Sequence, residues 1–163
     1  MNVTSQSCDV LPTPTRPLLG QLSGFDTVPS MPASVPSSHT DLLDAAIATL
    51  ATIGPDGRPQ VSAVWFLADD GVVKVSLNTA RQKVKNLTAN PAVTVFIPDP
   101  ANPAKYVEIR GDATLEPDAD YAFADRLGAK YGGADLRAMD GPDGRRVVVT
   151  VNPVRINAVD LSA

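Results

Sequence analysis

The stretch VVKVSLNTARQKVKNLTANP, residues 72–91, carries the clearest structural pattern in this 163-residue chain. Apolar and polar side chains alternate over Val72–Leu77, as they do in a half-buried strand. The tetrapeptide Thr79-Ala80-Arg81-Gln82 has the form of a capping box, which predicts a helix over 80–89 that ends at Asn90. The stretch therefore predicts a strand that passes through a short connection into a helix.

Two cations, Arg81 and Lys83, lie in the first turn of this expected helix. The positive end of the helix dipole opposes each of them by about 0.3–1 kcal/mol. The same end, with its free N–H groups, favours phosphate and other anions. The two cations are thus explained either by an anion site or by a solvated helix face, and both interpretations stay open on these residues alone.

Charge is unevenly distributed along the chain, whose net charge is −4. Residues 58–110 hold seven bases and four acids and so carry +3, whereas the segments before and after them carry −4 and −3. A local cationic region of this kind can attract a small anionic ligand. It is too weak, in a chain this acidic, to predict a nucleic acid as the main partner.

Length and composition predict one main folded domain. No apolar run approaches the roughly 20 residues of a membrane span, and the start of the chain lacks the pattern of a secretory signal. Cys8 is the only cysteine and His39 the only histidine, so neither an internal disulfide nor a histidine-rich metal site is expected. These features predict a cytoplasmic protein without a metal site.

Residues 1–38 hold six of the fifteen prolines together with many serines and threonines. Such a composition cannot bury much apolar surface, which predicts a flexible N-terminal arm. The folded domain is expected over residues 39–163.

Alternating and periodic segments follow one another through this domain. Strands are predicted over 48–53, 60–67, 72–77, 92–97, 105–115, 145–151 and 155–161, and helices over 42–47, 80–89 and 118–131. The turns Pro55-Asp56-Gly57 and Asp69-Asp70-Gly71 favour tight hairpins, because Asp-Gly tolerates positive φ. Six or seven antiparallel strands with helices outside them predict a small β-barrel.

Four motifs occur along the chain in a characteristic order. They are the hairpin Ala51–Ser62, the segment Val75-Ser76 followed by Arg81-x-Lys83-x-x-Asn86-Leu87-x-x-Asn90-Pro91, the strand Arg110-Gly111-x-Ala113 and the strand Arg145-Arg146-Val147. Together they resemble the flavin/deazaflavin oxidoreductases of the split β-barrel fold, the superfamily that includes the pyridoxamine 5'-phosphate oxidases. The resemblance covers about residues 42–160 and implies a mostly β split barrel with flanking helices.

Within this superfamily, the motifs resemble the actinobacterial branch that uses coenzyme F420. The resemblance implies a homodimer with the deazaflavin in a groove between the subunits, and hydride transfer between the reduced deazaflavin and a conjugated organic acceptor. It also implies that Lys83 and Arg81 contact the cofactor phosphate, with support from Ser76 and Asn86. The residues implied to flank the ring system are Gln60, Val61, Ser62 and Val64.

Two departures from the pyridoxamine phosphate oxidases bear on the substrate. Those enzymes usually place an FMN-binding arginine where this hairpin has Ser62, and they end in a basic substrate motif that residues 158–163 lack. Vitamin B6 oxidation is therefore not expected. FMN stays the alternative cofactor, since Arg81 and Lys83 could serve either phosphate. A non-catalytic flavin, deazaflavin or haem binder on the same barrel is the alternative from another class of protein.

For several side chains, the sequence leaves two interpretations open. Trp65 could flank the substrate pocket or simply pack, and Tyr106 and Tyr131 could donate protons or pack with their hydroxyls hydrogen-bonded. Arg145 and Arg146 point to opposite faces of a regular strand, so at most one of them faces the groove. The sequence assigns neither the proton donor nor the organic substrate.

Overall fold

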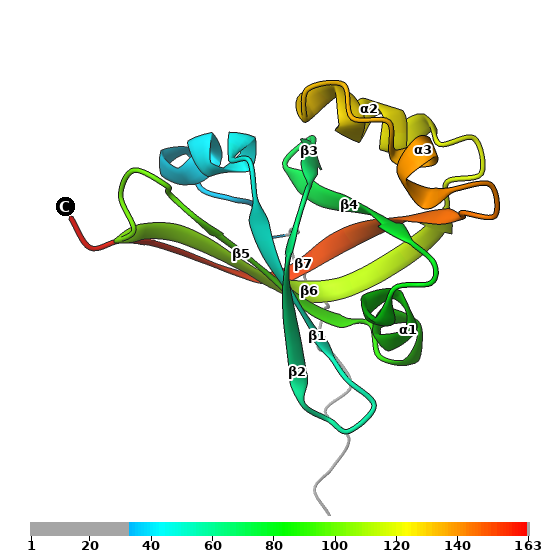
Figure 1. Ribbon diagram of the computed structural model, residues 1–163. Coiled ribbons are helices and arrows are strands. Elements are labelled where there is room, and N and C mark those ends of the chain that lie inside the picture. The colour runs from blue at the N-terminus through cyan, green and yellow to red at the C-terminus, as the bar shows by residue number, and fades with distance from the viewer. Residues whose placement is uncertain (1–32, 163) are drawn as a thin grey trace, which may run out of the picture. The chain divides into compact units, whose positions relative to one another are not determined.

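Two tight turns fix the first two hairpins of the fold. The computed structural model describes residues 33–162 (Figure 1). In the turn between β1 (Ala48–Ile53) and β2 (Pro59–Val64), Gly57 has a φ of 78°. In the turn between β3 (Leu67–Asp69) and β4 (Val72–Asn78), Asp70 and Gly71 both have positive φ. Both predicted Asp-Gly turns are confirmed, because positive φ at the turn residues matches the twist of a tight hairpin.

Seven antiparallel strands form one curled sheet (Figure 1). The remaining three strands are β5 (Ala92–Pro98), β6 (Lys105–Pro117) and β7 (Arg146–Asp160). Their order across the sheet is β2-β1-β5-β6-β7-β4-β3, which leaves β2 and β3 at its two edges. The predicted fold class is confirmed: the domain is mostly β, and its seven strands curl into a split half-barrel.

Within residues 33–162, four short helices lie outside the sheet. They are the 3-10 helix η1 (Ser37–Asp44), α1 (Gln82–Ala89), α2 (Ala122–Lys130) and α3 (Leu136–Asp140). Helix α1 contacts β1, and α2 contacts both β4 and α3. Figure 1 shows α2 and α3 together beyond β4, with η1 apart from them beside β3. The helices therefore cover separate parts of the sheet.

The main apolar core lies within the sheet, where Leu50, Phe66, Val95 and Val149 are at most 1% exposed. A second, smaller cluster joins α2 and α3 to the barrel. It consists of Tyr121, Ala124, Leu127 and Leu136, with Trp65, Leu67 and Tyr131 packed against it. This second cluster forms one wall of the site described below.

The strand predicted over 60–67 is wrong at its end. β2 stops at Val64, and Leu67 already belongs to β3 at the opposite edge of the sheet. The break has a physical cause, since the Tyr131 hydroxyl accepts a hydrogen bond from the Phe66 N–H and donates to the Phe66 carbonyl. These bonds satisfy backbone groups that would otherwise need a neighbouring strand.

The two strands predicted at 145–151 and 155–161 are one continuous strand, β7. It pairs with β6 along its length, and the register shifts between Arg110, which lies opposite Arg155, and Gly111, which lies opposite Pro153. A Cβ atom on Gly111 would lie 1.9 Å from the carbonyl oxygen of Asn152. A bulge therefore bends the strand without ending it, and only glycine fits opposite it.

The predicted helix boundaries also need correction. The N-terminal helix is a 3-10 helix that starts at Ser37 without a side-chain cap, and the helix predicted over 118–131 starts at Ala122. Asp118 precedes that helix, and its carboxylate accepts hydrogen bonds from the N–H groups of Phe123 and Ala124. Helix α3 was not predicted.

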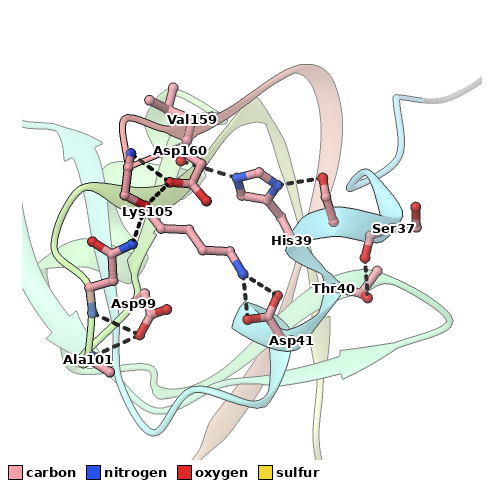
Figure 2. Close-up of polar contacts among 12 residues, drawn as sticks. Ser37, His39, Thr40, Asp41, Asp99, Ala101, Lys105, Val159 and Asp160 are labelled. Atoms are coloured by element: carbon pink, nitrogen blue, oxygen red, sulfur yellow. Dashed lines mark hydrogen bonds and ion pairs between the residues drawn. The ribbon is translucent and has the colours of Figure 1, made fainter.

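Contacts with β6 and β7 hold η1 in place (Figure 2). Lys105 donates to Asp41 at 2.7 Å, and the His39 ring lies 3.1 Å from the Val159 carbonyl oxygen. Residues 33–36 and η1 are thus part of the folded unit. The rest of the predicted flexible arm lies outside the described residues, and the division of the chain at residue 38 stays a prediction.

Candidate functional site

The connection between β4 and α1 differs from the predicted capping box. The Asn78 side-chain oxygen accepts a hydrogen bond from the Ala80 N–H, and the Arg81 N–H donates to the Asn78 carbonyl. The helix then begins at Gln82, with Arg81 at its N-cap and no side-chain cap. The capping box is therefore wrong: an Asn78 turn replaces it, and the first helical N–H groups keep no side-chain acceptor among residues 33–162.

Arg81 and Lys83 line a cavity of about 470 Å³. The complete lining is Ile47, Ala63, Val64, Trp65, Val75, Ser76, Leu77, Asn78, Arg81, Lys83, Leu127, Leu136, Met139 and Arg146. Lys83 is half-buried; its burial, and then the nearby Arg81 charge, lower the pKa of its amine below the ordinary value. In the described part of the chain, no carboxylate pairs with either cation.

An apolar wall faces this cationic part of the lining. Trp65 comes from the break between β2 and β3, Leu127 from α2, and Leu136 and Met139 from α3. The Trp65 ring stacks on Tyr131 with centroids 4.4 Å apart and an interplanar angle of 7°. Trp65 therefore packs on the residue that follows α2 and also lines the cavity, and its place beside a substrate stays a prediction.

Arg146, the third cation of the lining, is only 9% exposed, and its guanidinium is hydrogen-bonded to Asp140 and to Ser76. Its Nη2 donates to Asp140 Oδ1 at 3.0 Å, and its Nη1 donates to the carbonyl and the hydroxyl of Ser76 at 3.3 and 3.2 Å. Burial acts to raise the pKa of Asp140, but hydrogen bonds from Arg146 and Asn78 outweigh it and lower that pKa. Of the two arginines that the sequence could not distinguish, Arg146 therefore faces the cavity and Arg145 is exposed.

Asn86 occupies a different place from the cavity lining. It is 3% exposed, and its side-chain amide donates to Thr52 at 3.0 Å and to Gln60 at 2.9 Å. Its side-chain oxygen accepts a hydrogen bond from Gln82. These bonds fasten α1 to β1 and β2, so Asn86 sets the position of the helix that carries Lys83.

The eight sequence-predicted site residues thus fall into three groups. Val64, Ser76, Arg81 and Lys83 line the cavity; Gln60 and Asn86 are joined by a hydrogen bond behind it; Val61 and Ser62 lie on β2 outside the lining. Val61 is 61% exposed. The cofactor contacts of all eight residues stay predictions.

Sequence reasoning missed the wall contributed by α2 and α3. Leu127 lies within the helix predicted over 118–131 without any local sign of a site role, and Leu136 and Met139 lie in a five-residue helix too short to show periodicity. The tyrosines weighed as proton donors are otherwise occupied. The Tyr131 hydroxyl bonds to the Phe66 backbone, and Tyr106 packs on Phe96 with centroids 5.0 Å apart.

Arg110 and His39 lie outside this cavity. Arg110 pairs with Glu108 at 3.0 Å, and His39 lies in η1. Across residues 33–162, no group of three or more histidine, cysteine or acidic residues could hold a metal ion. No helix in that part of the chain has the length and apolar character needed to cross a bilayer.

A curled antiparallel half-barrel with helices outside it, and with a cavity between a cation-bearing helix start and an apolar wall, places the protein in the split-barrel class. The family model described as pyridoxamine 5'-phosphate oxidase matches residues 39–160, and the chain belongs to this family.

Solved structures agree with this assignment. A protein described as an F420 reductase is 38% identical, with a TM-score of 0.67 over 76% of this chain and 98% of its own. A conserved hypothetical protein from Mycobacterium tuberculosis is 26% identical, with a TM-score of 0.65 over 79% of this chain and 86% of its own. A putative pyridoxamine 5'-phosphate oxidase from Listeria innocua, 22% identical with a TM-score of 0.58 over 74% of this chain and 94% of its own, shares the fold.

Proposed function

We propose that this protein is an oxidoreductase that binds coenzyme F420 in the cavity lined by Arg81 and Lys83. In this proposal it catalyses hydride transfer between the reduced deazaflavin and a conjugated organic acceptor. The observation that carries the proposal is the half-buried Lys83 amine beside Arg81, at an uncapped helix start and without a carboxylate partner in the described chain. The similarity to an F420 reductase at 38% identity supports the choice of cofactor.

The residues present fit the phosphate of such a cofactor. Two adjacent cations repel one another, and an anion between them would relieve that repulsion. Lys83 and Arg81 would hold the phosphate through charge-assisted hydrogen bonds, each contributing on the order of 1.5–3 kcal/mol. The first N–H groups of α1 would add the favourable end of the helix dipole. Lys85, on the exposed side of the same helix, does not line the cavity.

The ring system of the cofactor would lie against β2. Val64 lines the cavity, and Gln60, Val61 and Ser62 precede it on the same strand. β2 is an edge strand, and its Val61 side chain is 61% exposed. A second copy of the chain packed on this edge would cover Val61 and close the groove, so we include a homodimer in the proposal.

Reduced coenzyme F420, when bound, would supply a hydride, and a proton would complete the addition of two electrons and two hydrogens to the acceptor. The protein's own task is to hold the two reactants and exclude water. Fixing the reacting carbon at roughly 3–3.5 Å from the hydride source removes most of the entropic barrier. Lys83 and Arg81 anchor one reactant, while the stacked Trp65 and the α3 wall limit the space for the other.

FMN is the second candidate cofactor, because the family match and the same two cations are compatible with its phosphate. The deciding experiment is a titration of the full chain with F420 and, in parallel, with FMN. Trp65 is the only tryptophan and lines the cavity, so its fluorescence reports binding directly. Micromolar binding of F420 with much weaker FMN supports the proposal. The reverse preference moves the protein to FMN, and binding of neither rejects both.

A further inference from the structure

We propose that the α3 side of the cavity is a distinct site for an uncharged, planar and apolar molecule. That this molecule is the hydride acceptor rests on the proposed function. The preference of the site for an uncharged, apolar molecule does not depend on that function. The lining has two unlike ends. Arg81 and Lys83, at the start of α1, form one end, and Leu127, Leu136 and Met139 from α2 and α3, with Trp65, form the other. Figure 1 shows α1 apart from the α2–α3 pair.

Among the lining residues, no unpaired charge lies at the apolar end. Arg146 is the only charged side chain of the lining apart from Arg81 and Lys83, and Asp140 neutralises it. Its Nη1 donates to the carbonyl and the hydroxyl of Ser76. An anionic ligand at this end would lose its hydration without gaining a partner, which is strongly unfavourable. Anions are therefore expected at the Lys83 end only.

Met139 provides the apolar surface that a ligand would cover. Its side chain lines the cavity and is nevertheless 68% exposed, although Leu136 in the same helix is 4% exposed. Methionine adapts its shape to flat ligands and makes favourable contacts with aromatic rings. Covering this side chain would remove apolar area from water, which favours binding.

Helix α3, which carries Met139, is held by contacts at both of its ends. Asp135 caps α3 by accepting from the Ala138 N–H at 2.9 Å, and Asp140 at its other end pairs with Arg146. The preceding loop packs so closely that a Cβ on Gly128 would lie 2.1 Å from the Ala134 carbonyl oxygen. The apolar end is thus a preformed surface, as small-molecule sites usually are.

Two fluorescent probes with one skeleton test the proposal. N-phenyl-1-naphthylamine is uncharged, and 8-anilinonaphthalene-1-sulfonate adds a single sulfonate. Both are titrated into the full-length, cofactor-free protein, first without inorganic phosphate and then with saturating inorganic phosphate. We expect the uncharged probe to bind about tenfold more tightly than the sulfonate, because only the sulfonate must lose a hydrated charge. We also expect menadione, which is planar and uncharged, to displace the uncharged probe, and phosphate not to displace it.

Variants at Met139 test whether the uncharged probe binds next to this side chain. Met139→Glu should weaken binding of the uncharged probe about tenfold, because a carboxylate beside an apolar ligand resists desolvation. Met139→Leu, the matched control, should bind within about twofold of the wild type, because it conserves volume and apolarity. Equal affinities for the two probes, displacement by phosphate, or an unchanged Met139→Glu variant would each overturn the proposal. The displacement experiment uses the wild-type protein, so its result tests the proposal even if a Met139 variant misfolds. Because no cofactor is added, failure of F420 and FMN to bind would reject the proposed function without altering this result.

Discussion

Arg146 of β7 donates to both carboxylate oxygens of Asp140 at the end of α3, so one buried ion pair fastens the cavity wall to the sheet. Both side chains are less than a tenth exposed. Asp140 also lies within hydrogen-bond reach of the Tyr121 hydroxyl, which donates at 2.9 Å to the Gly144 carbonyl. Stability and site geometry therefore depend on the same contact.

Asp140→Asn should lower the free energy of unfolding by about 3 kcal/mol, since it leaves the buried Arg146 cation without its counter-charge. Urea denaturation followed by circular dichroism measures the change. Asp143→Asn is the matched control, because Asp143 is exposed in the next loop and should change stability by less than about 0.5 kcal/mol. Equal effects of the two substitutions would contradict the role of the pair.

The Asp140–Arg146 pair should also make the free energy of unfolding depend on pH in the acid range. The pKa of Asp140 is lowered in the folded state, so folding favours the carboxylate. The stabilisation is then fully present above the unfolded pKa of about 3.9 and is lost as pH falls through the lower folded value. Urea denaturation between pH 5 and pH 2 should show a smaller loss of stability in Asp140→Asn than in the wild type. Parallel curves would show that Asp140 carries no such linkage.

Lys83→Ala should weaken F420 binding about tenfold to a hundredfold, through loss of a charge-assisted phosphate contact. Lys85→Ala has the same change of net charge on the same helix, but Lys85 is exposed and outside the lining. It should therefore bind F420 nearly as well as the wild type in a Trp65 fluorescence titration. Equal weakening by both substitutions would mean that only the overall charge matters.

Anion binding should also weaken at alkaline pH before ordinary lysines titrate. Burial lowers the pKa of Lys83 below 10.5, and the amine binds phosphate only while it is protonated. Affinity for F420 should therefore decline as pH rises toward that lowered pKa. Lys83→Arg should retain its affinity over the same range, because a guanidinium stays charged. Calorimetric titrations at several pH values compare the two proteins, and identical pH profiles would count against the assignment.

Gly111→Ala should destabilise the fold by about 1–3 kcal/mol, because the added methyl would meet the Asn152 carbonyl 1.9 Å away. Thermal unfolding detects the loss. Asp112→Ala tests the neighbouring exposed position and should leave the melting temperature almost unchanged. A stable Gly111→Ala protein would show that the bulge can open without penalty.

Local signals predicted the strands well, because the features that define them lie within a few residues. The Asp-Gly turns and the alternation in β4 depend on neighbouring residues alone. The end of β2, by contrast, depends on Tyr131 reaching the Phe66 backbone from far along the chain. No local pattern contains that information.

The candidate site was predicted on its cationic side and missed on its apolar side. Arg81 and Lys83 belong to a compact motif, whereas Met139 reaches the cavity from a helix that the Asp140–Arg146 pair ties to the sheet. The capping box was misread because Asn78 formed the competing turn, with its side chain bonded to the Ala80 N–H. Asx turns and helix caps use the same residue types, so the sequence pattern cannot separate them reliably.

The strand order has a consequence for synthesis on the ribosome. β4 pairs with β3 on one side and with β7 on the other, and β7 is the last of the seven strands to be made. Until β7 emerges, β4 exposes an unpaired edge, and the β3–β4 hairpin is joined to the rest of the sheet by no other strand. Nascent chains stalled before residue 146 should therefore lack the native sheet and need protection from edge-to-edge association.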